Sequence, residues 1–161
     1  MLDIGTIRHE IKQQRPFPSR SQEALVSLLR TTDLVKRRLG AAVEAQGITL
    51  QQYNVLRILR GAGKEGLPTL EIASRVVEQT PGITRLLGRL ERKSLVRRSR
   101  GSHDRRQVLC RISSRGLRLV TALDRPMQQA AESCLAPLSE PEALGLVHLL
   151  DRVRGGQTTP T

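Results

Sequence analysis

The spacing of apolar residues changes once along this chain, and that change restricts the folds open to it. In most segments leucine, isoleucine and valine recur every three or four residues, the interval of an amphipathic α-helix. Residues 95–98 and 107–112 instead resemble two short strands, the second with alternating apolar and polar side chains. A polar, arginine-rich turn at 100–106 separates them. The pattern predicts a mainly α-helical fold with one β-hairpin that has a basic tip.

Capping signals place the beginnings of three helices. A Ser or Thr followed three residues later by Gln or Glu fits a capping box, and this pattern occurs at residues 19–22, 49–52 and 139–142. The first of these helices is expected to run from about residue 21 to about residue 45, where Gly47 ends it.

A short helix and an interrupted one complete the helical outline. Residues 70–77 predict a short helix that Thr69 can cap, after a two-residue bridge of strand at 67–68. A longer helix is expected to start near residue 113 or 114. Pro126 lies inside its apolar pattern, so we expect a kink or a break there.

The helix that precedes the hairpin has a distinct start and a distinct outer face. Thr80 followed by Pro81 predicts its first turn, because a hydroxyl caps free N–H groups and proline suits the first helical position. The helix is expected to run to about Lys93. Its leucines fall on one side, whereas the opposite side carries Arg85 and Gly88.

The charge of the chain is concentrated in the same region. The 161 residues carry a net charge of +12, and the segment 85–106 supplies +7 of it from nine basic and two acidic side chains. Such an excess favours a polyanionic partner, either nucleic acid or an acidic membrane surface. The chain has one Tyr, one Phe and no Trp, which argues against proteins that stack single-stranded bases on aromatic rings. Double-stranded DNA is the better partner.

Several other classes of protein are excluded. No apolar run approaches the ~20 residues of a membrane span, and the N-terminus lacks the apolar core of a signal peptide, so we expect a cytoplasmic, nucleoid-associated protein. Cys110 and Cys134 do not form a disulfide framework and are interpreted as small hydrophobic residues. The sequence shows no metal-binding spacing, nucleophile–base set or phosphate-binding loop. We therefore predict neither a metal, nor a cofactor, nor an enzyme.

The order of the predicted elements is that of a winged helix-turn-helix. Two helices joined by a tight connection are followed at once by a hairpin, and a long helix precedes them. In such proteins the second helix of the pair enters the major groove and presents side chains from its N-terminal part. Here that recognition helix is the one expected to begin at Thr80.

The sequence resembles the MarR family of bacterial winged-helix transcription regulators. The resemblance rests on residues 49–56, on 80–86 in the recognition helix and on 89–98 before the hairpin. Asp104-Arg105-Arg106 fits the Asp-x-Arg signature of the family's wing, and residues 112–116 stand where the family has Leu-Thr-x-x-Gly. The motifs occur in order from about residue 21 to residue 125. Ser94 departs from the pattern, because glycine is usual there, and we expect slight strain in that turn.

The resemblance implies a homodimer whose outer helices pack across a two-fold axis and whose winged units grip a pseudo-palindromic site. The sequence agrees, since the outer helical segments carry more apolar stripe than one small winged unit can cover. The expected divisions are an N-terminal extension at 1–18, a dimerisation helix at 19–47, a winged helix-turn-helix at 48–112, C-terminal dimerisation helices at 113–154 and a disordered tail at 155–161.

The recognition helix supplies the first group of candidate DNA contacts. Arg85 is assigned to guanine, because its guanidinium matches the O6 and N7 acceptors. The neighbouring candidates would contact bases, thymine methyl groups or phosphates at the groove edge: Gln79, Thr80, Pro81, Gly82 and Thr84. Arg89, Lys93 and Arg98 are assigned to phosphates, which position a protein without specifying sequence. For Arg92 and Lys93, compensation of the helix dipole explains the charge as well as DNA contact does.

The wing supplies the second group. Asp104 is expected to pair with Arg106 and to fix the turn, unless the two form an ordinary exposed ion pair. Arg105 or Arg100, together with Ser102, is assigned to the minor groove, where narrow A·T-rich segments attract arginine.

These observations predict a sequence-specific transcription regulator, most simply a repressor that a small molecule releases from its operator. Any effector pocket would be mainly aliphatic, with Tyr53 its aromatic residue. A non-specific architectural DNA-binding protein would share the charge but show only salt-dependent affinity. A basic helical module for protein–protein interaction, or an enzyme, is a third possibility, which absence of DNA binding would favour.

Overall fold

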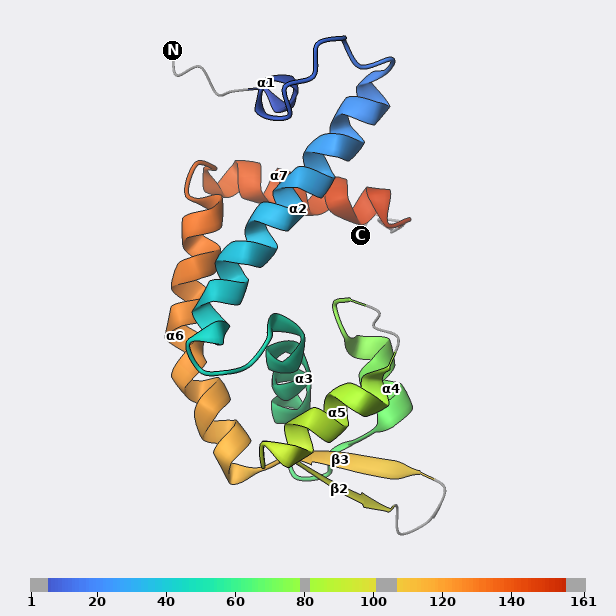
Figure 1. Cartoon of the computed structure of the whole chain (residues 1–161), viewed down its shortest axis with the longest axis vertical. Helices are drawn as coiled ribbons and strands as arrows, with labels where there is room; N and C mark the ends of the chain where they lie inside the picture. Colours follow the sequence, from blue (N-terminus) through green and yellow to red (C-terminus); the bar gives the residue numbers. More distant parts are fainter. Residues whose placement is uncertain (1–5, 79–81, 101–106, 156–161) are drawn as a thin grey trace.

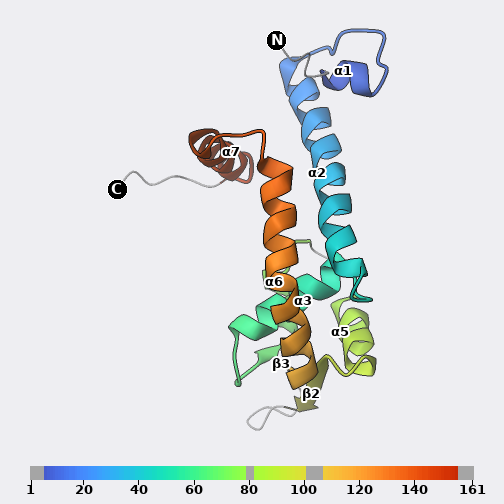
Figure 2. The same ribbon diagram turned by 90° about the vertical axis from the view of Figure 1, so that its left-hand side faces the viewer.

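The computed structural model describes residues 6–78, 82–100 and 107–155 of the chain. In chain order its elements are α1 (Ile7–Glu10), α2 (Arg20–Glu44), α3 (Leu50–Gly61), β1 (Leu67–Pro68), α4 (Thr69–Arg75), α5 (Ile83–Arg92), β2 (Val96–Arg100), β3 (Val108–Ile112), α6 (Ser114–Leu135) and α7 (Glu140–Val153). The molecule is elongated, with α3, α4, α5 and the sheet at one end and α1 and α7 at the other (Figure 1). The long helices α2 and α6 run side by side between the two ends (Figure 2).

The predicted capping signals are used at all three helix starts. The Ser19 hydroxyl accepts the backbone N–H of Gln22 at 3.2 Å. Thr49 forms a complete capping box, because its side chain accepts from the N–H of Gln52 and the Gln52 side chain accepts from the N–H of Thr49. The carboxylate of Glu142 accepts the N–H of Ser139 at 2.8 Å. These local bonds explain why the helix starts could be predicted from the sequence.

The predicted hairpin is present and belongs to a three-stranded antiparallel sheet in the order β1-β3-β2. Val96 pairs with Ile112 and Leu67 pairs with Cys110. The predicted bridge of strand at 67–68 is thereby confirmed as β1. Since Val96 and Cys110 are buried and the rest of β2 is exposed, the sheet joins the core at one end and projects at the other.

The hydrophobic core lies where α3, α5 and the sheet meet. Its fully buried side chains include Leu56 and Leu59 from α3 and Leu87 and Leu90 from α5. Helix α6 joins this core closely at Gly116, where a Cβ would lie 2.2 Å from the carbonyl oxygen of Leu95. Glycine is therefore required there by packing.

The start of the recognition helix differs from the prediction. Helix α5 begins at Ile83, and its N-cap is Gly82, with φ +95° in the left-handed region. A left-handed residue cannot lie inside a right-handed helix, so the helix does not extend back through residue 82 to Thr80. Thr80 and Pro81 themselves lie outside the described residues.

Thr69 does not cap the short helix. It is the first residue of α4, behind an extended Pro68, and its hydroxyl donates to the carbonyl of Val108 at 3.4 Å. The hydroxyl is used there because β1 holds this segment against β3. The helix consequently starts and ends earlier than predicted.

Pro126 does not break α6. The helix continues from Ser114 to Leu135, although proline removes one N–H donor from it. Packing of α6 along α2 and α3 compensates for that loss. None of the described helices has both the length and the apolar character needed to span a membrane.

Large apolar side chains remain exposed along the outer helices. On α7, Leu144, Val147, Leu149 and Val153 are each more than half exposed, and none of the described α7 residues is buried. On α2, Leu25 and Leu29 are similarly exposed. The apolar stripe expected from the sequence is therefore uncovered in the single chain.

Candidate nucleic-acid interface

Helix α5 presents a polar outer face because its apolar face is fixed in the core. Leu86, Leu87 and Leu90 are buried. Thr84, Arg85 and Arg89, on other sides of the helix, are exposed. At the helix start, a Cβ at residue 82 would lie 3.4 Å from an Nη atom of Arg85, so Gly82 leaves room for the guanidinium. The exposed side chains of α5 can therefore approach a groove while the helix stays anchored.

The turn after α5 fixes the angle between this helix and the hairpin. The N–H of Ser94 donates to Glu91 at 2.8 Å and that of Leu95 to Leu90 at 3.0 Å, the two bonds of a Schellman motif. Ser94 has φ +57°, the left-handed conformation that favours glycine. The strain expected at this position is thus located in its backbone. The Ser113 hydroxyl donates to the Ser94 carbonyl at 2.7 Å and holds the turn.

An ion pair crosses the same turn. The Arg98 side chain of β2 donates to the carboxylate of Glu91 on α5, with Nε 2.7 Å from the oxygen. The hydrogen bond from Arg98 holds the pKa of Glu91 below its usual value, and the pKa of Arg98 is raised for the same reason. Arg98, assigned to phosphate from the sequence, therefore has a partner within the chain. Lys93 likewise donates to the carbonyl of Gly47.

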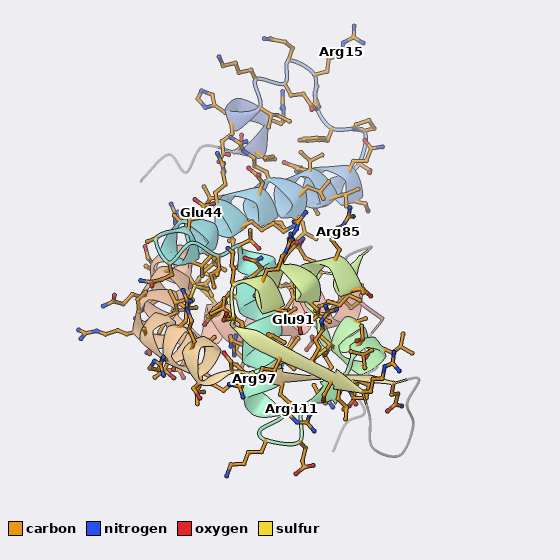
Figure 3. The ribbon with its side chains drawn as sticks, turned by 60° about the horizontal axis from the view of Figure 1, so that its bottom comes forward. Arg15, Glu44, Arg85, Glu91, Arg97 and Arg111 are labelled. Carbon is orange, nitrogen blue, oxygen red and sulfur yellow. The ribbon has the colours of Figure 1, made fainter. Side chains whose placement is uncertain are left out.

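The outward face of the hairpin holds two basic residues that the sequence analysis did not assign to the site. Arg97 and Arg111 are directly opposite each other across β2 and β3 (Figure 3). Like charges placed this way are unfavourable, and Arg111 is held by the Lys64 carbonyl and the Ser99 hydroxyl, each at 2.9 Å. Strand alternation placed both arginines on one face, which is the signal that could have identified them.

The structure places some of the predicted DNA-contacting residues on two elements, α5 and β2. Gly82, Thr84, Arg85 and Arg89 belong to α5 or its N-cap, and Arg98 and Arg100 belong to β2. The other predicted contacts lie outside the described residues: Gln79, Thr80, Pro81, Ser102, Asp104, Arg105 and Arg106. The expected Asp104–Arg106 pair therefore stays a prediction.

The Cys110 thiol is poorly placed for chemistry. Cys110 is buried, and burial raises the pKa of its thiol. A buried, protonated thiol is a poor nucleophile. Within the described ranges, no group of three His, Cys, Asp or Glu side chains is arranged to hold a metal ion.

A cavity lies between α2 and the helices around α5. This cavity, about 610 Å³ in volume, has apolar walls that include Leu39, Leu50 and Met127. Tyr53 also lines it, with the Arg57 guanidinium 6.0 Å from the ring centroid. Desolvation by burial raises the pKa of Tyr53. Tyr53 is the one aromatic residue among the described residues of the lining, as expected from the sequence, but polar and charged residues such as Lys36, Arg57 and Glu78 stand among the aliphatic ones.

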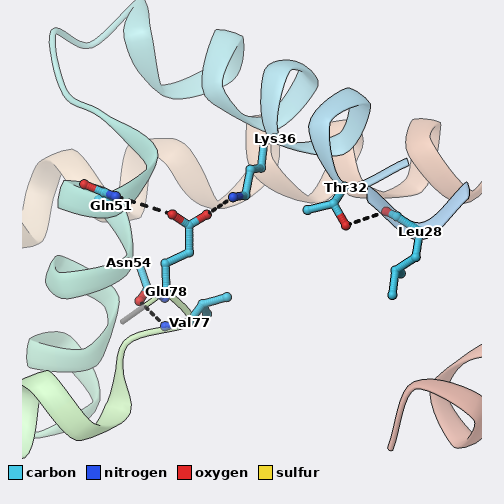
Figure 4. Close-up of polar contacts among 7 residues, drawn as sticks. All are labelled: Leu28, Thr32, Lys36, Gln51, Asn54, Val77 and Glu78. Carbon is cyan, nitrogen blue, oxygen red and sulfur yellow. Dashed lines mark hydrogen bonds and ion pairs between the residues drawn. The ribbon is translucent and has the colours of Figure 1, made fainter. Parts of the chain in front are cut away.

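A polar cluster lies at this cavity and joins three elements. The carboxylate of Glu78, between α4 and α5, accepts from Lys36 of α2 at 2.6 Å and from Gln51 of α3 at 3.4 Å (Figure 4). The N–H of Val77 donates to the Asn54 side chain at 3.1 Å. Sequence reasoning missed this cluster because its members lie far apart along the chain.

Helices α3, α4 and α5 are followed by a paired hairpin, and α5, the second helix of the helix-turn-helix pair, is basic and exposed. These features define a winged helix-turn-helix DNA-binding protein. Comparison with known proteins narrows the class. A model of the MarR family matches residues 48–108. A MarR transcription factor from Planctomyces limnophilus is 38% identical in a structural alignment that covers 84% of this chain and 98% of that one, with a TM-score of 0.66.

Two further relatives support the same result. The homoprotocatechuate degradative operon repressor of Escherichia coli is 25% identical over 126 residues, which cover 78% of this chain and 84% of the repressor. S. aureus MepR, solved in complex with DNA, shares the fold with a TM-score of 0.74 at 24% identity over 88% of this chain and 100% of MepR. The chain belongs to the MarR family. It is a DNA-binding transcription regulator and not an enzyme.

Proposed function

We propose that this chain is a homodimeric repressor that binds a pseudo-palindromic operator and is released by a small-molecule effector. The observation that carries the DNA-binding part is the exposed polar face of α5, whose opposite face is buried in the core. A helix anchored in this way presents side chains to a groove without unfolding.

Arg85 is the residue we assign to base recognition. It is exposed in the first turn of α5, and the side-chain-free Gly82 leaves space beside its guanidinium. Arginine matches the two acceptors of guanine in the major groove. Thr84 and Gly82 would contact the adjacent bases or phosphates, and Arg89 would contact a phosphate.

The hairpin would contact the neighbouring minor groove and its phosphates. Arg100 lies at the end of β2 and is exposed. From the sequence, we assign Ser102 and Arg105 to the same contacts and Asp104 to an ion pair with Arg106 that fixes the turn. Gln79, Thr80 and Pro81 would lie at the edge of the major groove, beside α5. Arg98 would reach phosphate only by sharing its guanidinium between the DNA and Glu91.

The exposed apolar faces of α2, α6 and α7 support the homodimer. A monomer rarely leaves so many large apolar side chains in water along continuous helices. A second copy of the same chain would cover them by two-fold symmetry. The two α5 helices would then face two half-sites of one operator.

The cavity beside α2 supports the effector. Its volume of about 610 Å³ suits a small molecule. Its walls come from α2 and also from α3 and α5, which belong to the winged helix-turn-helix from α3 to β3, here called the winged unit. A ligand bound there would contact the part of the chain that reads DNA and the part that dimerises. The name of the E. coli relative is that of a repressor, which supports the same sign of regulation here. Because such a regulator acts on the chromosome, we place it in the cytoplasm.

Binding assays with matched arginine variants test the proposal. A duplex selected from a random pool and a scrambled duplex of equal length would be titrated with the parent, Arg85→Ala and Arg38→Ala. Arg38 is an exposed residue of α2 that is not among the residues lining the cavity between α2 and α5. We expect Arg85→Ala to lose ~1–3 kcal/mol of binding to the selected duplex and Arg38→Ala to lose much less. Equal affinity of the parent for both duplexes would overturn the proposed function.

A further inference from the structure

The carboxylate of Glu78 connects two helices that belong to different parts of the molecule. One of its oxygens lies 2.6 Å from Nζ of Lys36 on α2, and the other accepts from Nε2 of Gln51 on α3 at 3.4 Å. Figure 4 shows both contacts converging on the one side chain. Glu78 thus links α2, a helix with an exposed apolar face, to the winged unit.

Glu78 belongs to the segment that leads into α5. It follows α4, which ends at Arg75, and α5 begins at Ile83. The neighbouring Val77 donates its N–H to the Asn54 side chain of α3 at 3.1 Å. The position of this segment, and with it the entry to the recognition helix, depends on bonds to α2 and α3.

The ion pair between Lys36 and Glu78 forms at neutral pH, but it is weak enough for another anion to replace Glu78. The hydrogen bond from Lys36 is the main cause that keeps the pKa of Glu78 below its usual value, so the carboxylate is charged at neutral pH. The Lys36 side chain is 50% exposed and that of Glu78 is 38% exposed. Ion pairs this accessible to water shift an equilibrium by no more than about 5-fold. A dissolved anion can compete for Lys36.

The cavity beside this pair determines which anions compete well. Both residues line it together with apolar side chains such as Leu39, Leu50 and Met127. A molecule with an apolar body gains affinity from these walls. If it also carries a carboxylate, that group can take the place of the Glu78 carboxylate on Lys36.

We propose that Lys36 is the anion-binding residue of the cavity and that Glu78 is its built-in competitor. An amphipathic carboxylate displaces Glu78 from Lys36, and the released Glu78 no longer ties the segment before α5 to α2. The loosened segment weakens DNA binding. By linkage, DNA binding favours the Lys36–Glu78 pair and weakens the ligand to the same degree. This inference rests on the proposed function, since it specifies how an effector acts.

The first test opens the pair without any ligand. Glu78→Gln and Lys36→Met would each be titrated with selected duplex DNA, and each should bind about 2- to 5-fold more weakly than the parent. The double variant should bind no more weakly than the weaker single variant. The result for Glu78→Gln is diagnostic, because removing a negative charge should by itself strengthen DNA binding.

Two variants control for the changes in charge. Arg38→Met removes a positive charge from α2 beside Lys36, and Glu71→Gln removes a carboxylate from α4 that pairs within its own helix, with Arg75. Neither should reproduce the loss expected from Glu78→Gln. Thermal unfolding of each variant would establish that it is folded, and Lys36→Gln would replace any unstable Lys36→Met. DNA binding by Glu78→Gln that equals or exceeds that of the parent would overturn the proposal.

The second test supplies an anion. Binding of octanoate and of its uncharged analogue octanamide would be measured by calorimetry for the parent, Glu78→Gln and Lys36→Met. Octanoate should bind Glu78→Gln about 2- to 5-fold more tightly than the parent, and Lys36→Met, which lacks the cation, should bind it more weakly than Glu78→Gln does by at least that factor. Octanamide should not distinguish Glu78→Gln from the parent.

The outcomes separate the two proposals. Equal octanoate affinities for all three proteins, or no binding even to Glu78→Gln, would overturn the exchange while leaving the DNA-binding function intact. Failure of the parent to prefer any DNA sequence would instead overturn the proposed function.

Discussion

The winged unit buries most of its large apolar side chains, whereas the outer helices expose many of theirs. Apart from Val43, Val120 and Leu123, every buried hydrophobic residue of the described chain lies between residues 48 and 112. Helices α2, α6 and α7 instead leave many leucines and valines in water. The winged unit completes its own core, whereas the outer helices leave apolar surface exposed that the proposed dimer would bury. In the proposed dimer, DNA recognition and assembly would therefore use regions with different sources of stability.

The largest loss of stability is expected from a substitution in the core of the winged unit. Leu87 of α5 is fully buried and belongs to the hydrophobic core. We predict that Leu87→Ala lowers the free energy of unfolding by ~2–5 kcal/mol, the cost of the lost contacts and the cavity left behind. Urea unfolding at fixed protein concentration measures it, with the highly exposed Val77→Ala as the control. A loss no larger than that of the control would mean that the core is not where we place it.

On the outer helices, the largest effect should be on assembly. Leu149 of α7 is 57% exposed in the single chain. If a second copy covers it, Leu149→Asp buries an unpaired carboxylate and should raise the dimer dissociation constant at least ~10-fold. Leu70→Asp on α4 changes a side chain that is 84% exposed and should leave the dimer intact. Sedimentation equilibrium distinguishes these results, and equal dissociation constants for both variants would exclude α7 from the interface.

The turn between α5 and the wing offers a stabilising change. Because Ser94 has φ +57°, Ser94→Gly should raise the free energy of unfolding by ~0.5–1 kcal/mol, as glycine adopts this conformation without a Cβ clash. Ser99→Gly in β2, where the backbone is extended, should lower it. Thermal unfolding gives both signs, and destabilisation by Ser94→Gly would contradict the assigned conformation.

The smallest expected effect is a pH-dependent one at the junction of α3 and α6. Arg60 donates to Asp124 at 2.8 Å, and this bond lowers the pKa of Asp124. A carboxyl whose pKa is lower in the folded chain stabilises it above the unfolded pKa, and that contribution is lost as pH falls through the folded pKa. Because both side chains are partly exposed, we expect only ~0–1 kcal/mol. Asp124→Asn should destabilise the chain at pH 7 and make no difference well below pH 3; a pH-independent difference would contradict this.

Features of the fold that depend on residues close together in the sequence could be predicted, whereas features that depend on distant contacts could not. The capping boxes at Thr49 and Ser139 and the two strands of the hairpin depend on residues a few positions apart, and they were predicted. The start of α5 was not, because the Thr80-Pro81 pattern competes with the left-handed Gly82. Thr69 was misassigned for a similar reason, since its hydroxyl bonds to Val108 across the sheet.

In the candidate site, too, the features set by local sequence were predicted and those set by tertiary contacts were not. The exposed residues of α5, including Arg85, followed from helical periodicity. The Glu91–Arg98 pair needed the turn geometry at Ser94, and the Lys36–Glu78 pair needed the packing of α2 against the winged unit. No local pattern in the sequence signals either pair.

Our central claim is that the winged unit binds DNA and that the outer helices join two copies of it by two-fold symmetry. The symmetry of the DNA sequences that the protein selects tests this claim most directly. Duplexes bound by the parent would be selected from a random pool and aligned. We predict an inverted repeat whose half-site centres lie about one helical turn, ~10–10.5 base pairs, or a multiple of it, apart. Selected sequences without two-fold symmetry, or with no consensus, would contradict the account.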